Sequence, residues 1–445
     1  MIFKQPGFFL ILFLLATVFN TNTYARQLFS IHGSNTIGSQ LAPALVKAYL
    51  KHEYNATNVR YVERQKEEGV VVGYHGTNGQ KLEVEIFAHG SSTGFKSLKN
   101  GVAQIAMSSR LIKAKEVSKL SFLGDLKSFK SENVVGLDGI AVIVHQSNPL
   151  SEISRKDLTD IFSGKYTHWQ QLGGAFKSSK FINKRINVYT RDNKSGTFDT
   201  FKKLVLVNKT KLVKHAKRFE SNALLSDEVS QDSYAIGFVG LPYIRQSKGL
   251  SISEGTGKPR LPNALTVATE DYALSRRLYM YIAEQEDNAD VMDFINFVQN
   301  EAGQKIVDNI GFVSQNVYAT EINVPAFYPD EYKQLTAGAE RLSVNIHFNE
   351  DTLTPDNRAK RDLKRITDFI KSRKSVKDIM LFGFSEDNDF TMFNISLSES
   401  RADYVQLLLK KEGLMATKMR GYGAVNPVAM NSVIEKNRRV EVWIR

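Results

Sequence analysis

Strand and helix patterns alternate from Gln27 onward, and this order restricts the chain to a small set of folds. Apolar runs at 28–31 and 82–87 precede amphipathic stretches at 41–50 and 95–99. Alternation of this kind predicts an α/β sheet with helices on its faces. In such sheets ligands bind beyond the carboxyl ends of the strands, so a binding site is expected in the loops at those ends.

Length and composition bound the number and kind of domains. At about 100 to 200 residues per domain, the 445 residues predict two or three hydrophobic cores. Hydrophobic residues make up 42% of the chain and charged residues 24%, which argues against extended disorder. There is no cysteine, so disulfides, thiolate catalysis and cysteine metal sites are excluded.

The charge balance is basic. Lysine and arginine number 59 against 47 aspartates and glutamates, which gives a formal net charge of +12. A basic surface raises the local concentration of small anions, and it also suits acidic envelope polymers or nucleic acid. The sequence has no zinc-finger spacing, basic-region heptad or ribonucleoprotein motif, so no nucleic-acid partner is expected.

The N-terminus has the pattern of an export signal. Lys4 precedes an apolar stretch at 8–19, and residues 23–25 (Thr-Tyr-Ala) resemble a cleavage site. The alternative is a membrane anchor, but the apolar run is shorter than the ~20 residues of a spanning helix. We therefore expect a signal peptide over 1–25 and an exported product. With no cysteine at the cut, the product is not expected to be a lipoprotein.

A second, smaller domain is predicted in the C-terminal part. Residues 322–340 lose any clear period and contain two prolines, which predicts a linker between a first domain at 26–321 and a second at 341–445. The second domain is expected to be a compact α+β unit. Its expected elements are strands at 342–348, 379–384 and 440–444 and helices at 355–372 and 397–412.

A polar turn at 191–197 joins a strand pattern to a helix pattern. It contains Arg191, Ser195, Gly196 and Thr197, and apolar positions then recur at helical spacing. Free N–H groups at a helix start attract anions, while the guanidinium and the two hydroxyls add donors. The set suits capture of a fully ionised oxyanion such as phosphate or sulfate. The alternative is an ordinary N-cap.

Two other loops have the same form. Residues 33–36 (Gly-Ser-Asn-Thr) and 90–94 (Gly-Ser-Ser-Thr-Gly) each follow a strand pattern and precede a helix pattern. Glycine allows a close approach to a ligand, and the hydroxyls lie at a helix start. Either loop alone is also explained as a cap. Three such helix starts in one α/β domain favour a shared anion site.

Further motifs accompany these loops in order. They are 105–110 (Ile-Ala-Met-Ser-Ser-Arg), 139–144 (Gly-Ile-Ala-Val-Ile-Val), 148–149 (Asn-Pro), 161–164 (Ile-Phe-Ser-Gly), Trp169, 235–240 (Ala-Ile-Gly-Phe-Val-Gly) and 274–278 (Leu-Ser-Arg-Arg-Leu). With them the sequence resembles the phosphate-binding proteins of ABC phosphate transporters, the PstS family, over 27–320. The resemblance implies a type II periplasmic binding fold, in which two α/β lobes joined by two crossing strands close on the anion. By position it implies phosphate contacts from Thr36, Ser91, Arg191, Ser195, Gly196 and Thr197.

Position 109 departs from the family pattern. Many members have an aspartate that accepts a hydrogen bond from a protonated phosphate, whereas this chain has Ser109, which donates or accepts. A carboxylate would oppose a fully ionised sulfate, because two facing acceptors leave a buried pair unsatisfied. The hypothesis is that Ser109 broadens the range of ligand protonation states that the site accepts. Phosphate and sulfate are then both candidate ligands.

Enzymatic motifs are not found. The eight histidines show no metal-ligand spacing, and there is no Gly-x-Ser-x-Gly elbow or Walker loop. The run at 63–68 is interpreted as a solvated charged face. We therefore expect a binding protein with no cofactor and no metal, and not an enzyme.

The C-terminal domain carries its own ordered motifs. Ser398 is expected to begin a helix whose first turn projects Arg401 toward Glu386, which follows the preceding strand, so that the two charges flank one pocket. The alternative is a surface salt bridge, worth less than about 1 kcal/mol. The motifs are 379–386 (Ile-Met-Leu-Phe-Gly-Phe-Ser-Glu), 394–405, 421–423 (Gly-Tyr-Gly), 426–427 (Asn-Pro) and 437–441 (Asn-Arg-Arg-Val-Glu).

This set closely resembles the OmpA-like peptidoglycan-binding domain over 341–445. The resemblance implies that Glu386 meets the ammonium of diaminopimelate in the cell-wall peptide and that Arg401 grips its carboxylate, with Asn394 as a weaker candidate. Two departures are that the family's usual aspartate is Glu386 here and that 431–437 is short and lacks a Gly-Arg pair.

The sequence as a whole predicts a Gram-negative envelope protein. A PstS-like domain is expected to capture inorganic phosphate or a similar oxyanion in the periplasm, and an OmpA-like domain to hold it on peptidoglycan near the outer membrane. An ABC permease or an outer-membrane protein is a further possible partner. The alternatives are a structural tether with a vestigial binding domain and a weak phosphatase.

Overall fold

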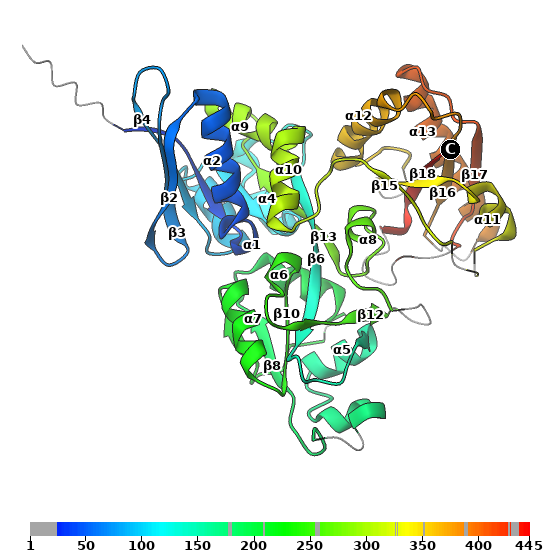
Figure 1. Ribbon diagram of the computed structural model, residues 1–445, viewed down its shortest axis with the longest axis horizontal. Helices are drawn as coiled ribbons and strands as arrows, with labels where there is room; N and C mark the ends of the chain where they lie inside the picture. Colours follow the sequence, from blue (N-terminus) through cyan, green and yellow to red (C-terminus); the bar gives the residue numbers. More distant parts are fainter. Residues whose placement is uncertain are drawn as a thin grey trace, which may run out of the picture.

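The computed structural model describes residues 25–445 apart from 177–179, 208–209, 254–258, 325, 327, 350–351, 387–389, 426–427 and 429–435. It has two lobes that share an eleven-stranded sheet and a C-terminal domain with a five-stranded sheet of its own (Figure 1). The expected signal peptide at 1–25 lies outside the described residues except for Ala25. No helix in the described ranges is long and apolar enough to cross a membrane.

The first lobe is built on parallel strands with helices on both faces. β1 pairs with β4 and β5 in parallel, and β2 and β3 form an antiparallel edge. The aromatic rings of Tyr49 and Phe294 pack together where α2 and α9 cover one face. The elements are β1 (Arg26–Gly33), α1 (Asn35–Gly38), α2 (Leu41–Tyr54), β2 (Thr57–Gln65), β3 (Glu68–Tyr74), β4 (Lys81–Phe87), α3 (Ser91–Lys99), β5 (Ile105–Ser108), α4 (Ala114–Lys119), α9 (Ala289–Gln299) and α10 (Glu301–Ile310).

Two strands cross from one lobe to the other. β6 (Glu132–Val144) pairs along its first half with β13 (Ser275–Tyr281) and along its second half with β10 (Ala235–Gly240), and all thirteen of its residues are buried. A long strand buried on both faces is an apolar run, as residues 139–144 are. The prediction of two α/β lobes joined by crossing strands is confirmed.

The second lobe contains the junction at 191–197. β8 is parallel to β10 and β9, and α6 begins just after the end of β8. Trp169 is fully buried in this lobe's core and stacks on Phe176. The remaining elements are β7 (Glu152–Ser154), α5 (Arg155–Phe162), β8 (Asn187–Arg191), α6 (Gly196–Leu204), β9 (Lys217–Phe219), α7 (Asn222–Gln231), β11 (Lys248–Gly249), β12 (Ser251–Ser253) and α8 (Ala264–Ala268).

The C-terminal domain is the predicted α+β unit. Its sheet has the order β14-β15-β18-β16-β17, with helices packed against it. The elements are β14 (Ala319–Glu321), α11 (Asp330–Thr336), β15 (Glu340–His347), α12 (Asn357–Ser372), β16 (Ile379–Phe384), α13 (Thr391–Lys411), β17 (Lys418–Gly421) and β18 (Arg439–Ile444).

One helix start differs from the prediction. α13 begins at Thr391, so Ser398 lies inside the helix instead of opening it. The Ser398 hydroxyl donates to the carbonyl of Ile395 one turn back and accepts from the N–H of Gly423. Serine is common at helix starts, but here its hydroxyl bonds within and across the helix, which the local sequence does not distinguish.

The segment at 322–340, expected to be a linker, contains helix α11 and packs on the C-terminal sheet. Tyr332 is buried, stacks on Tyr328 and donates a hydrogen bond of 2.7 Å to Glu441. Just before it, β14 pairs with β15, so the C-terminal sheet begins inside the range assigned to the first domain. A three-residue strand and a seven-residue helix are too short to show a period, which is why no pattern was visible.

Candidate functional site

Four loops meet where the two lobes face each other. In the first lobe, residues 34–36 follow β1, Ser91 follows β4 and Ser109 follows β5; in the second, residues 195–197 follow β8. All four loops leave the carboxyl ends of parallel strands, the place where α/β sheets bind ligands. The structure thus brings all seven sequence-predicted phosphate-binding residues into one cleft.

The cleft is closed over these residues. The hydroxyl oxygens of Thr36 and Thr197 lie 3.0 Å apart across the two lobes. The Ser91 hydroxyl accepts from the backbone N–H of Ser109 at 3.1 Å. All seven side chains or backbones are buried: Thr36, Ser91, Ser109, Arg191, Ser195, Gly196 and Thr197. Solvent is therefore excluded from the donors that line the cleft.

The 191–197 turn caps a helix and also faces the other lobe. The Ser195 side chain caps α6, because its hydroxyl accepts from the N–H of Phe198 at 3.3 Å. At the same time Gly196 lies directly against the other lobe: a Cβ added there would be 2.2 Å from the Ser91 hydroxyl oxygen and 2.6 Å from that of Ser109. The helix start is thus a cap and one wall of the cleft.

Arg191 supplies a buried cation to the cleft. Its Nε donates to the carbonyl of Phe219 at 3.2 Å, and its Nη2 lies 3.4 Å from Oδ1 of Asn35. Nη1 has no hydrogen-bond partner among the described residues. Burial lowers the pKa of Arg191 to about 10, so the group is still charged at neutral pH. A buried donor of this kind points to an anionic acceptor in the cleft.

A second arginine, which the sequence analysis did not assign, lies beside it. Arg276 on β13 donates from Nε and Nη2 to Oδ2 of Asp138 at 2.9 and 2.5 Å, and Nη2 lies 3.4 Å from the Thr36 hydroxyl. Its Nη1 also has no partner within the described ranges. Burial raises the pKa of Asp138, while the Arg276 ion pair opposes that shift. Arg276 lies in the motif at 274–278, and this motif is the feature of the sequence that points to it.

Amide side chains order the floor of the cleft. Asn222 donates from Nδ2 to Oδ1 of Asn35 at 3.2 Å and lies 3.3 Å from the Thr36 hydroxyl. Asn35 in turn donates to the carboxylate of Glu67. The run at 63–68 is therefore not wholly a solvated face, since Glu67 is partly buried against the site and burial raises its pKa.

Ion pairs close both rims of the cleft. On one side His89 bridges Glu68 of the first lobe and Glu220 of the second, with contacts of 2.7 and 2.8 Å. Burial lowers the pKa of His89, but the bonds to Glu220 and Glu68 outweigh it and leave the pKa raised. On the other side Arg110 pairs with Asp199 at 2.9 Å. These contacts exist only when the lobes are together.

Two of the three predicted wall-binding residues, Glu386 and Arg401, lie together. Nη1 of Arg401 is 3.3 Å from Oε2 of Glu386, and Nε of Arg438 is 2.7 Å from Oε1 of the same carboxylate. The Arg401 guanidinium lies over the ring of Phe348 at 5.5 Å. Burial raises the pKa of Glu386, but a backbone hydrogen bond and the two arginines outweigh it, so the pKa is lowered.

This group is buried instead of exposed. Arg401, Glu386 and Asn394 are at most 4% exposed, so the alternative of a surface salt bridge is wrong. Asn394 lies one helical turn before Ser398 on α13, and its side chain is buried. Arg438 belongs to the motif at 437–441, and its contact with Glu386 adds it to this group. In the described part of the chain no group of three or more histidines and carboxylates has metal-site geometry.

Both domains match known protein families. A family model described as a PBP superfamily domain matches residues 28–302, and an OmpA family model matches 347–441. Protein SphX of Synechococcus elongatus is 32% identical over 296 residues, covering 64% of this chain and 81% of SphX. The phosphate-binding protein PstS of Staphylococcus aureus is 30% identical over 243 residues, covering 53% of this chain and 71% of PstS.

A solved structure has the same fold as the first domain. It is a phosphate ABC transporter substrate-binding protein of Clostridium perfringens with bound phosphate, and it matches with a TM-score of 0.51 at 23% identity, covering 65% of this chain and 99% of that one. The fold, the ordered loops and the sequence relatives agree. The chain belongs to the PBP superfamily, among the SphX- and PstS-like proteins, and carries an OmpA family domain after it.

Proposed function

We propose that this protein captures inorganic phosphate, or a similar tetrahedral oxyanion, between its two lobes. The observation that carries the proposal is a closed, buried cleft with serine and threonine hydroxyls, in which Arg191 and Arg276 each keep one buried guanidinium nitrogen without a partner among the described residues. An oxyanion with acceptors on every face complements such donors. The named relatives SphX and PstS, one of them described as phosphate-binding, support the choice of ligand.

The identity of the anion depends on Ser109. Its hydroxyl lies 3.5 Å from that of Ser91 and faces Gly196 across the cleft. A hydroxyl rotates to donate or to accept, so it tolerates a ligand with or without a proton. We propose that phosphate is bound over a broad range of protonation and that sulfate is a weaker second ligand.

Isothermal titration calorimetry of the mature chain with phosphate, sulfate and molybdate between pH 5 and pH 9 tests both statements. Binding of phosphate at all pH values with weaker sulfate binding is the expected result. Rejection of sulfate throughout would overturn the role given to Ser109. Absence of binding by all three anions would favour the alternative of a structural tether, and release of phenolate from an aryl phosphate would favour a phosphatase.

The C-terminal domain is proposed to hold the protein on peptidoglycan in the periplasm of a Gram-negative envelope, through Glu386, Arg401 and, more weakly, Asn394. The OmpA family match over 347–441 and the ion pair of Glu386 with Arg401 support this. Handover of phosphate to an ABC permease and contact with an outer-membrane protein are part of the same proposal.

Co-sedimentation with purified sacculi tests the anchor. Arg401→Gln keeps a polar, hydrogen-bonding side chain at the buried position but removes the guanidinium charge. It should lower the bound fraction severalfold, because the partner of the diaminopimelate carboxylate is lost. Arg420→Gln is the control, since Arg420 is exposed and pairs with Glu331 away from Glu386. Unchanged sedimentation of Arg401→Gln, with a native circular dichroism spectrum, would contradict the assignment.

A further inference from the structure

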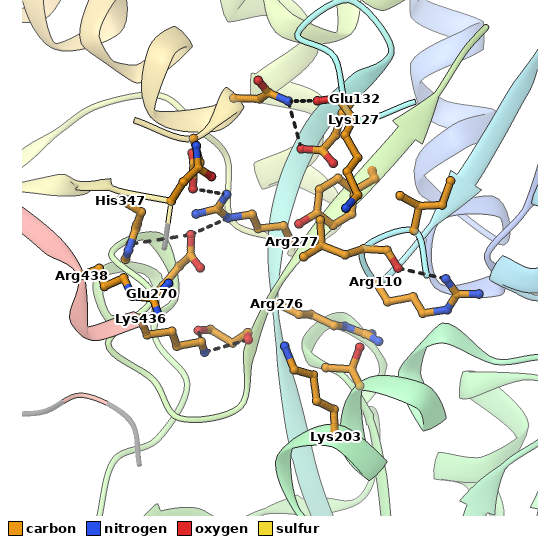
Figure 2. A pocket seen from close by; sticks show the side chains of 18 of the residues that line it. Arg110, Lys127, Glu132, Lys203, Glu270, Arg276, Arg277, His347, Lys436 and Arg438 are labelled. Carbon is orange, nitrogen blue, oxygen red and sulfur yellow. Dashed lines mark hydrogen bonds and ion pairs between the residues drawn. The ribbon is translucent and has the colours of Figure 1, made fainter. Parts of the chain in front are cut away.

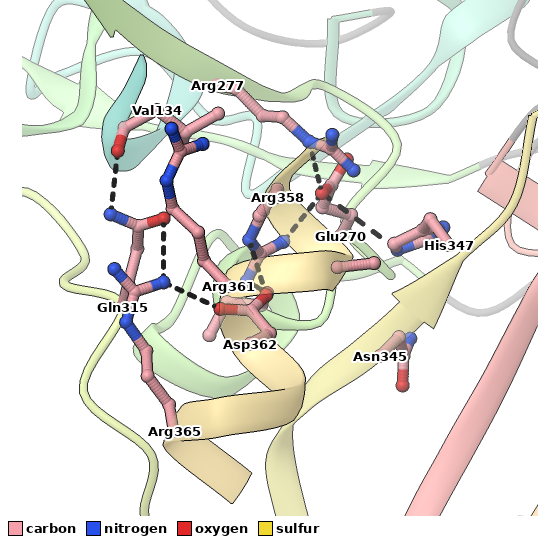
Figure 3. Close-up of polar contacts among 12 residues, drawn as sticks. Val134, Glu270, Arg277, Gln315, Asn345, His347, Arg358, Arg361, Asp362 and Arg365 are labelled. Atoms are coloured by element: carbon pink, nitrogen blue, oxygen red, sulfur yellow. Dashed lines mark hydrogen bonds and ion pairs between the residues drawn. The ribbon is translucent and has the colours of Figure 1, made fainter. Parts of the chain in front are cut away.

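The C-terminal domain docks on strand β13 and on the residues just before it. Figure 3 shows Glu270, just before β13, in contact with Arg277 of β13 and with Arg358 of α12, at 2.7 and 2.6 Å. Arg277 also reaches Asp356 at 2.7 Å. These side chains are mostly buried, so the two domains share one polar interface.

Two other contacts extend this interface. Arg341 of β15 pairs with Asp271 at 2.7 Å, and both side chains are at most 7% exposed. The ammonium of Lys436 donates to the hydroxyl of Ser275 at 2.7 Å and to its carbonyl at 2.9 Å. Buried charges with several partners require a fixed geometry, which means that the docked arrangement is specific.

A cavity of about 970 Å³ lies between the docked domain and the lobes. Figure 2 shows Arg110, Lys127 and Lys203 approaching it from the lobes, and His347 and Arg438 from the C-terminal domain. Nine lysine or arginine residues and four carboxylates line it. The excess of cations favours an anionic occupant, and the volume is that of a site for a drug-sized molecule.

The cavity wall reaches the buried Glu386–Arg401 pair. Arg438 and Phe348 line the cavity. Arg438 donates to Glu386, and the Phe348 ring lies under the guanidinium of Arg401. The Glu386–Arg401 pair is buried. The side chains of Arg438 and Phe348 lie between this pair and the cavity.

We propose that the interdomain cavity is the binding site for the cell-wall peptide, built from both domains. The ligand is a short anionic peptide that ends in a zwitterionic diaminopimelate. Arg438 and Phe348, which line the cavity, turn aside for the diaminopimelate end, so that its ammonium meets Glu386 and its terminal carboxylate meets Arg401 and Arg438. The other carboxylates of the peptide lie near Lys127 of the first lobe and Lys360 of α12. This inference rests on the proposed function, since it extends the same wall-binding site from Glu386 and Arg401 into the interdomain cavity.

Lys127 and Lys360 carry the inference because they come from different domains, Lys127 from the first lobe and Lys360 from α12 of the C-terminal domain. Both line it, both are exposed, and neither makes an ion pair among the contacts of the described residues. Their ammonium groups therefore supply charge that internal carboxylates do not neutralise. The first lobe thereby contributes to a site that the C-terminal domain alone would not complete.

Calorimetric titration of the full mature chain with a diaminopimelate-containing tripeptide tests the proposal. Lys127→Glu and Lys360→Glu should each weaken tripeptide binding about fivefold. Each variant removes an ammonium that attracts the peptide carboxylates and adds a carboxylate that repels them, and solvent partly screens both interactions. The effect should shrink at high salt. Phosphate affinity should be unchanged in both variants.

Matched controls are Lys99→Glu in the first lobe and Lys371→Glu on α12, which are exposed lysines that do not line the cavity. If Arg401→Gln abolishes tripeptide binding while both cavity variants bind like the wild type, the cavity is not the site, and the wall-binding function stands without it. If the wild-type chain binds neither tripeptide nor sacculi, the wall-binding function itself is refuted and this inference falls with it.

Discussion

A single methyl group at Gly196 should prevent the lobes from closing. Gly196 is the first residue of α6, and its backbone is not in the left-handed region, so alanine fits the helix itself. In the closed cleft, however, the new Cβ would lie 2.2 Å from the Ser91 hydroxyl oxygen and 2.6 Å from that of Ser109. Both serines belong to the other lobe, so the clash arises only on closure.

The cost can be estimated from the contacts that would be lost. Overpacking a buried contact costs about 1–3 kcal/mol, and separating the hydroxyls of Thr36 and Thr197, now 3.0 Å apart, costs about 1 kcal/mol. Gly196→Ala should therefore weaken phosphate binding by roughly 30-fold to several hundredfold, at about 1.4 kcal/mol per tenfold. The ligand-free chain should lose no stability, because alanine is a better helix former than glycine.

Calorimetry with phosphate and thermal unfolding with and without phosphate measure the two effects separately. Gly249→Ala is the matched control, since a Cβ there meets no atom nearer than 3.5 Å and the residue lies in the same lobe. Wild-type phosphate affinity in Gly196→Ala would refute the reasoning, because it would show that ligand binding does not need this closed contact.

Three further variants probe the cleft and the docking interface. Arg276→Met should weaken phosphate binding about tenfold or more in calorimetry, because a charge-assisted hydrogen bond is lost; equal affinity would remove Arg276 from the site. His89→Gln should bind phosphate more weakly than the wild type at acidic pH, and the difference should vanish as pH rises through the raised pKa of His89, because the protonated ring bridges the lobes; a ratio constant from pH 5.5 to 8.5 would contradict this bridge. Arg341→Met should lower the free energy of unfolding in urea by about 3–5 kcal/mol by leaving Asp271 buried and unpaired, while Arg341→Met with Asp271→Leu should recover most of it; a neutral single variant would show that the interface is not closed in solution.

The sequence was sufficient for features with a local cause. The helix starts after β1, β4 and β8 could be predicted because glycine, serine and threonine between an apolar run and an amphipathic run have few other uses. Ser109 was located by its motif, and the structure places it beside Gly196 of the other lobe. The start of α13 was misplaced because Ser398 looks like a cap, and its actual partner, Gly423, lies 25 residues further along the chain.

Strand β13 shows why the roles of other residues could not be predicted from the sequence. Successive side chains of a strand point to opposite faces. Arg276 accordingly turns to Asp138 and the anion cleft, whereas its neighbours Ser275 and Arg277 turn to the C-terminal domain. Two adjacent arginines in one motif thus serve two different sites, and only the partners on each face distinguish them. Those partners come from β6 and from the C-terminal domain, both remote in sequence, so no local pattern could assign either role.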